Sequence, residues 1–103
     1  MGEYLIVLRL VPRLHEASGW TPGDHEAVAA HFVRLEAGVQ EGVVVLAGRT
    51  VEPFADTFGL VIFRAADDEA AERFMNDDPT VARGVMTARL HPYSVALTGR
   101  RNQ

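Results

Sequence analysis

The segment Glu3–Val11, EYLIVLRLV, decides how the rest of the sequence folds. Its β-branched and aromatic side chains are typical of a strand, and Pro12 ends it. From Tyr4 to Val11 both alternating sets of side chains are apolar, with Arg9 as the single polar residue. A strand that is apolar on both sides needs cover on both faces of its sheet.

A long helix follows the loop that contains Trp20. Thr21 is the expected N-cap, with Asp24 as a nearly equal alternative, and the helix should run to about Gln40. One apolar stripe, with steps of four, three and four residues, is expected to face the sheet: Val28, Phe32, Leu35 and Val39.

Three more strands are expected, at Val43–Ala47, Thr57–Arg64 and Val85–Leu97. The link between the first two of these is short and lacks a helix, so they should be antiparallel neighbours. Pro92 lies inside the last segment and has no backbone donor. It therefore predicts an edge strand or a bend at that point.

A second helix is expected at Ala65–Asn76, with Asp67 or Asp68 as its cap. Asp78 then precedes a proline, which disfavours helical geometry and ends this helix. The segment that follows looks like a capped short turn of helix that stops at Gly84.

The resulting order, βαββαβ, predicts a ferredoxin-like α+β fold with a four-stranded antiparallel sheet. Its two helices can cover only one face of that sheet. The other face would be an apolar patch that is unusual in a monomer, so we expect a homodimer that forms through the sheet faces. One domain should span residues 1–97, and residues 98–103 should form a flexible tail.

The composition excludes several classes of function. The 103 residues include no cysteine and no lysine, which removes thiol chemistry, Schiff bases and a lysine-containing phosphate loop. A net charge of −4 without a basic cluster argues against a nucleic-acid partner. No apolar stretch is long enough to span a bilayer, and a cytoplasmic location is expected. No histidine pair has the spacing of a metal site.

Five residues are candidates for a site. His31 lies on the flank of the first helix and could act as a general base, with Asp78 to orient its ring. Arg49 could bind a substrate carboxylate, and His91 and Trp20 could line the same cavity. Each also has a plain structural interpretation: a solvated histidine, an N-cap, a surface ion pair, a half-open strand or dimer seam, and a loop anchor.

The sequence also resembles a known family. His31–Leu35, followed by Glu41–Gly48, is similar to the His-Leu-x-x-Leu … Gly-x-Leu-Leu-x-Ala-Gly pattern of the YCII-related (YciI-like) family. Phe74–Val85 resembles the family's Asp-Pro-x-x-x-x-Gly-Leu/Val segment, and Leu90–Tyr93 resembles its final strand. The resemblance covers roughly residues 3 to 96.

This resemblance implies a dimeric α+β barrel with a pocket in each subunit that holds a His–Asp pair, carried here by His31 and Asp78. It favours an enzyme that uses no cofactor and performs general acid/base chemistry of lyase, isomerase or dehalogenase type on a small aromatic or carboxylated metabolite. The alternative is a non-catalytic module that binds a small molecule or a partner.

Overall fold

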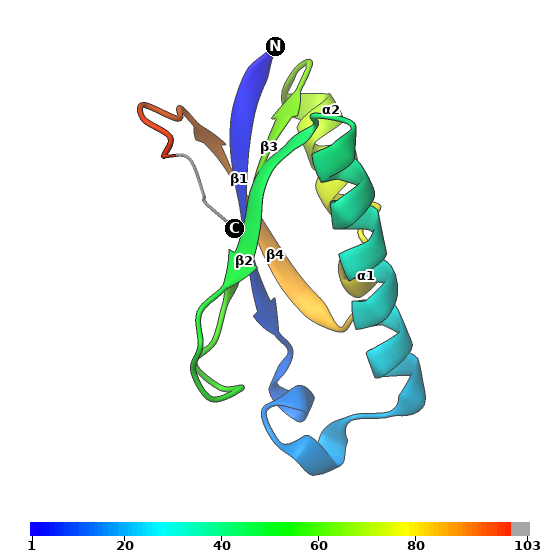
Figure 1. Cartoon of the computed structure of the whole chain (residues 1–103). Coiled ribbons are helices and arrows are strands. Elements are labelled where there is room, and N and C mark those ends of the chain that lie inside the picture. Colours follow the sequence, from blue (N-terminus) through cyan, green and yellow to red (C-terminus); the bar gives the residue numbers. More distant parts are fainter. Residues whose placement is uncertain (100–103) are drawn as a thin grey trace.

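A computed structural model describes residues 1–99 (Figure 1). Most of the tail predicted at 98–103 lies outside the described residues. The elements follow in the order β1 (Gly2–Leu10), η1 (Pro12–Leu14), η2 (Ala17–Gly19), α1 (Pro22–Gln40), β2 (Val44–Arg49), β3 (Gly59–Ala65), α2 (Asp68–Asn76), α3 (Pro79–Ala82) and β4 (Met86–Tyr93). Among the described residues, no helix combines the length and the apolar character needed to cross a membrane.

The predicted ferredoxin-like α+β fold is confirmed. The four strands lie in the order β2-β3-β1-β4, and every neighbouring pair is antiparallel. The short link between β2 and β3 does join antiparallel neighbours, as expected. Pro92 lies in β4, which is an edge strand, so the backbone donor that it lacks is missing at the margin of the sheet.

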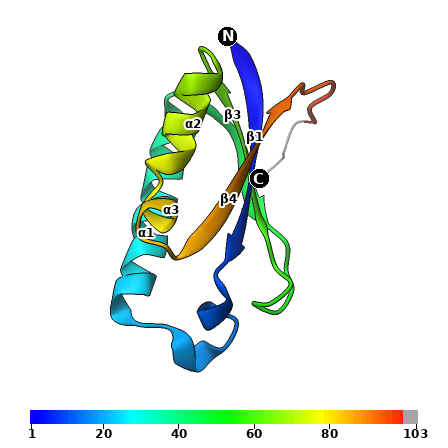
Figure 2. The same cartoon turned by 180° about the vertical axis from the view of Figure 1, so that it is seen from behind.

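The helices α1, α2 and α3 lie against one face of the sheet, and no helix of the described residues covers the other face (Figures 1 and 2). Alternate residues of β1 and β3 point to the helices, and these make most of the core. The buried members of that core are Tyr4, Ile6, Leu8, Leu35, Val44, Val61, Phe63 and Ala71. The intervening residues Leu5, Val7, Leu60 and Ile62 face the open side and are half-buried.

The start of α1 is fixed by Thr21, which is the N-cap. The Thr21 side chain accepts a hydrogen bond from the backbone of Asp24, and the Asp24 carboxylate accepts one from the backbone of Thr21. Arg13 then binds both carboxylate oxygens of Asp24, at 2.7 and 2.8 Å. These hydrogen bonds, that from Arg13 first, hold the pKa of Asp24 far below its usual range. The loop after β1 is thereby fastened to the helix.

The face of α1 that meets the sheet differs from the predicted stripe. Leu35 is buried as expected, but the side chains of Phe32 and Val39 are 66% and 52% exposed. Gly38 makes the close contact with the sheet instead: a Cβ atom at this position would lie only 2.6 Å from Cγ2 of Val44. The helix therefore turns Gly38 towards β2, and the apolar stripe points partly to the rim of a cavity.

The last strand is shorter than predicted. It ends at Tyr93 rather than Leu97, and the backbone of Val95 donates a hydrogen bond to the side chain of Glu3. The second helix also starts later than predicted: it begins at Asp68 and has Asp67 as its N-cap. Residues 94–99 belong to no strand.

The contact at Gly38 gives a first test. Substitution Gly38→Ala favours the helix but forces a methyl group against buried Val44. We expect the free energy of unfolding to fall by about 1 kcal/mol, because overpacking outweighs helix propensity. Gly23→Ala is the matched control, since its Cβ would meet only Oγ1 of Thr21 at 3.7 Å. Urea denaturation measures both, and an equal stabilisation by the two alanines would contradict the close packing.

Candidate active site

His31 and Asp78, 47 positions apart in the sequence, form a hydrogen-bonded pair. His31 projects from the middle of α1, and Asp78 is the N-cap residue of α3. Nδ1 of His31 lies 2.6 Å from Oδ2 of Asp78, and the two side chains are 14% and 6% exposed. An ionised carboxylate can only accept, so Nδ1 carries the proton and Nε2 is the free ring nitrogen.

The second oxygen of Asp78 caps α3. Oδ1 accepts hydrogen bonds from the backbone and the hydroxyl of Thr80, at 2.9 and 2.6 Å. Burial by itself raises the pKa of Asp78, but the hydrogen bonds from His31 and Thr80 outweigh burial and leave that pKa below its usual range. Asp78 is therefore ionised at neutral pH, and it acts as an N-cap and as the partner of His31 together.

A third charged group, Arg34, lies beside this pair and was missed in the sequence. Its Nη1 is 3.8 Å from Oδ2 of Asp78, and its Nη2 donates to the backbone oxygen of Phe74 at 2.9 Å. The guanidinium also lies over the ring of Phe74, 4.3 Å from the ring centre. The available signal was the spacing, because residues three apart on a helix lie on the same side.

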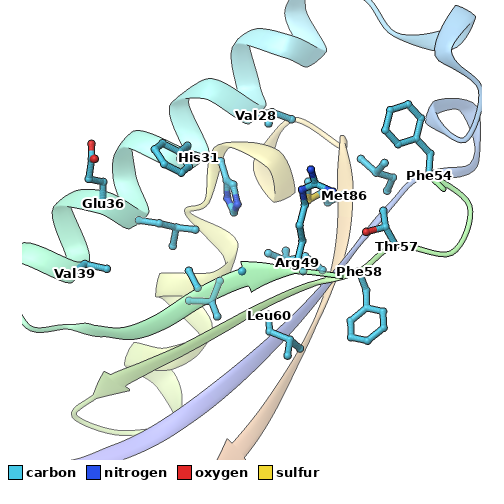
Figure 3. A pocket seen from close by; sticks show the side chains of 18 of the residues that line it. Val28, His31, Glu36, Val39, Arg49, Phe54, Thr57, Phe58, Leu60 and Met86 are labelled. Carbon is cyan, nitrogen blue, oxygen red and sulfur yellow. The ribbon is translucent and has the colours of Figure 1, made fainter. Parts of the chain in front are cut away.

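A cavity of about 620 Å³ lies between α1 and the side of the sheet formed by β2, β3 and their connecting loop (Figure 3). His31 lines it from the helix, and Arg49 lines it from the end of β2. Figure 3 shows these two side chains projecting into the same space from opposite walls. Most of the remaining lining is apolar and includes Phe32, Leu35 and Phe54.

Trp20 lines this cavity and also anchors its own loop. Its indole N–H donates to the backbone oxygen of Leu14 at 3.0 Å. Its ring stacks on His25 with 4.9 Å between ring centres and packs against Phe54 at 5.5 Å. Both interpretations of Trp20, as loop anchor and as cavity wall, therefore describe its position.

The other two candidates, Arg49 and His91, lie in different places: Arg49 lines the cavity and His91 does not. Arg49 has no carboxylate within ion-pair distance among residues 1–99, and the one hydrogen bond of its side chain within that range goes to the backbone oxygen of Thr50, at 3.5 Å. His91 pairs with Leu5 in the sheet and is exposed on the open face, outside the cavity. In the part of the chain that is described, no three His, Cys, Asp or Glu side chains gather as a metal site would require.

Comparison with known proteins decides the family. The family model of the YCII-related domain matches residues 5–90, which is most of the chain. The chain belongs to the YCII-related family. The resemblance found in the sequence is thereby confirmed, and both His31 and Asp78 lie within the matched residues of the YCII-related domain.

A solved structure shares the fold of this YCII-related chain. It is the 5-chloro-2-hydroxyhydroquinone dehydrochlorinase (TftG) of Burkholderia phenoliruptrix AC1100, in complex with 2,5-dihydroxybenzoquinone. The TM-score is 0.66 over 89% of this chain and 93% of that chain, with 17% sequence identity. A search of curated proteins finds no match.

The lowered pKa of Asp78 predicts an acid-dependent stability of the YCII-related domain. Its contribution is complete above the pKa of an unfolded aspartate, about 3.9, and is lost as the pH falls through the lower folded-state value. We expect Asp78→Asn to cost about 1–3 kcal/mol at neutral pH, and this difference from wild type to shrink below about pH 4.

Urea denaturation over a pH series measures that difference. Asp77→Asn is the control, because Asp77 is the adjacent acid and its side chain is exposed. A cost of Asp78→Asn that grows as the pH falls would contradict the hydrogen-bonded, ionised carboxylate.

Proposed function

We propose that this protein is an enzyme that removes a proton from a small aromatic or carboxylated metabolite, with His31 as the general base. The observation that carries this proposal is the hydrogen bond between Nδ1 of His31 and the buried carboxylate of Asp78. That bond leaves Nε2 as the one basic ring atom available at the cavity. Asp78 orients the ring and stabilises the imidazolium that forms when His31 takes the proton.

The walls of the cavity support an aromatic substrate with an anionic group. Trp20, Phe54 and Phe32 offer flat apolar surfaces, and a volume of about 620 Å³ suits a small molecule. Arg49 is the cation on the wall opposite His31, and its guanidinium would bind a carboxylate or phenolate of the substrate.

Loss of a hydrogen halide is the reaction that we favour. His31 takes a proton from the substrate, the electron pair that the proton leaves behind forms a new double bond in the product, and halide departs with the electrons of its bond to carbon. The dehydrochlorinase that shares this fold is named for such a loss, which supports this choice. Lyase and isomerase reactions begin with the same removal of a proton and are the other members of the class. The proposed step uses His31 and Asp78 alone and calls for no cofactor.

A panel of halogenated hydroquinones, halogenated phenols and aromatic carboxylates tests this function. Halide release and product masses are measured for wild type, His31→Ala and His91→Ala. We expect His31→Ala to lower kcat by about 10²–10⁴-fold, because the general base is lost. His91→Ala, on the open face, should leave kcat unchanged.

The alternative function, a binding module, has a distinct outcome in the same panel. A compound that raises the melting temperature of wild type and His31→Ala equally, without any turnover, would contradict the enzyme and favour simple binding. Undiminished turnover by His31→Ala would also contradict the proposed role of His31 as the general base.

We also propose that the protein is a homodimer that pairs its open sheet faces. The support is the apolar centre of that face, where Ile62 lies in register between Leu5 and Leu46. The side chain of Leu46 is 51% exposed in the single chain. Burial of these side chains against a second copy would remove apolar surface from water. His91 belongs to this face, so its expected place is the dimer seam.

Light scattering coupled to size exclusion tests the dimer. We expect the mass of two chains for wild type and of one chain for Ile62→Glu, because a charge at the centre of the seam would be desolvated without a partner. Thr87→Glu is the control, since Thr87 lies exposed on the same face beside Arg9, away from the apolar centre. A wild-type protein that runs as one chain at every concentration would overturn the proposal.

A further inference from the structure

Arg34 has a buried nitrogen that the fold alone does not explain. Its Nη1 is inaccessible to solvent and has no hydrogen-bond partner among the residues that the structure describes. A buried donor without a partner costs free energy, on the order of 1–3 kcal/mol. The nearest acidic group is the carboxylate of Asp78, whose Oδ2 lies 3.8 Å away.

The guanidinium of Arg34 is held rigidly by its other contacts. Nη2 donates to the backbone oxygen of Phe74, which lies in the last turn of α2 where carbonyls lack helical partners. The ring of Phe74 lies under the guanidinium and stacks on buried Phe63 with 4.3 Å between ring centres. The position of the charge is therefore set by the core and by the end of α2.

The geometry points to Arg34 as a positioning residue for His31, which it serves through Asp78; this inference rests on the proposed function. The same oxygen, Oδ2, faces the imidazole at 2.6 Å and the guanidinium at 3.8 Å. The longer distance is too great for a hydrogen bond but lies within ion-pair range, so the guanidinium is a counter-charge beside the carboxylate. Arg34 thus places a positive charge beside the carboxylate and does not compete with Nδ1–H for its oxygen.

This arrangement keeps His31 available as a base. Arginine carries a permanent charge, so Asp78 has a counter-charge even while the imidazole is neutral. Without that cation the carboxylate would be balanced only by a protonated His31, which cannot accept a proton from a substrate. Among the described residues, the other charged side chains that line the cavity are Glu36, on the same helix as His31, and Arg49, on β2.

A purely structural role for Arg34 makes a different prediction. As a cap of α2 and a partner of the Phe74 ring, Arg34 would contribute to stability and have no effect on the imidazole. Two substitutions separate these roles. Arg34→Gln keeps an N–H donor for the Phe74 oxygen but removes the charge, whereas Arg34→Lys keeps the charge and loses the planar fork.

Nitrogen-15 NMR of His31 is the deciding measurement, because it distinguishes the neutral ring protonated at Nδ1 from the doubly protonated ring without any substrate. At a fixed pH, we expect Arg34→Gln to raise the doubly protonated fraction of His31 severalfold. Arg34→Lys should restore the wild-type fraction. Arg83→Met is the matched control, because Arg83 also joins α1, through Glu26 at 3.4 Å, but on the exposed surface.

An unchanged His31 spectrum in Arg34→Gln would overturn the inference, even if its melting temperature falls. A changed spectrum in Arg83→Met of the same size would overturn it as well. Once a substrate is found, Arg34→Gln should lower kcat by about 10–100-fold with little change in KM. If no compound of the panel turns over, the proposed function fails, while the spectrum still decides the role of Arg34.

Discussion

The two oxygens of one buried carboxylate hold the candidate site together. Oδ1 of Asp78 caps α3 through Thr80, and Oδ2 binds His31 on α1. A helix as short as α3 is not stable on its own, so its cap and its packing decide whether it forms. The cap in turn fixes the backbone and side chain of Asp78. The ring of His31 is thereby oriented by a local feature of the segment Asp78–Ala82.

The cavity beside His31 follows from how α1 approaches β2. The helix comes closest where Gly38 meets Val44, a contact that no larger residue allows without movement. Other side chains of α1, from Val28 to Val39, line an open space that extends to the end of β2. His31 lies among these lining residues, and its side chain is mostly buried and still borders the cavity.

Local patterns predicted much of this structure. The element order, the Thr21 cap and the edge position of Pro92 depend on neighbouring residues, and all three are correct. The sheet-facing stripe of α1 was wrong at Phe32 and Val39, because a periodic pattern does not distinguish an apolar core from an apolar cavity rim. Gly38 has no side chain, so its close contact with Val44 does not show in the hydrophobic pattern of the sequence.

Long-range contacts set the remaining features. Arg34 meets Asp78 and Phe74 only after α1 packs on the link between α2 and α3. Its spacing of three from His31 places it on the same side of α1 but does not indicate a charge buried beside a carboxylate. The end of β4 at Tyr93 likewise depends on its partner strand, since β1 begins at Gly2 and the register leaves no residue opposite Leu97.

Each central strand of the sheet carries two sets of side chains, one that faces the helices and the cavity and one that faces the open side. Leu8 and Val61 point to the helices and line the cavity, whereas Val7 and Ile62, each one position away, face the open side. A change on the open face can therefore alter association without replacing a cavity side chain. The strong apolar character of both sets explains why β1 lacks the usual alternation. The set that faces the helices forms the core and lines the cavity, whereas the set on the open face packs against no helix within the described part of a single chain.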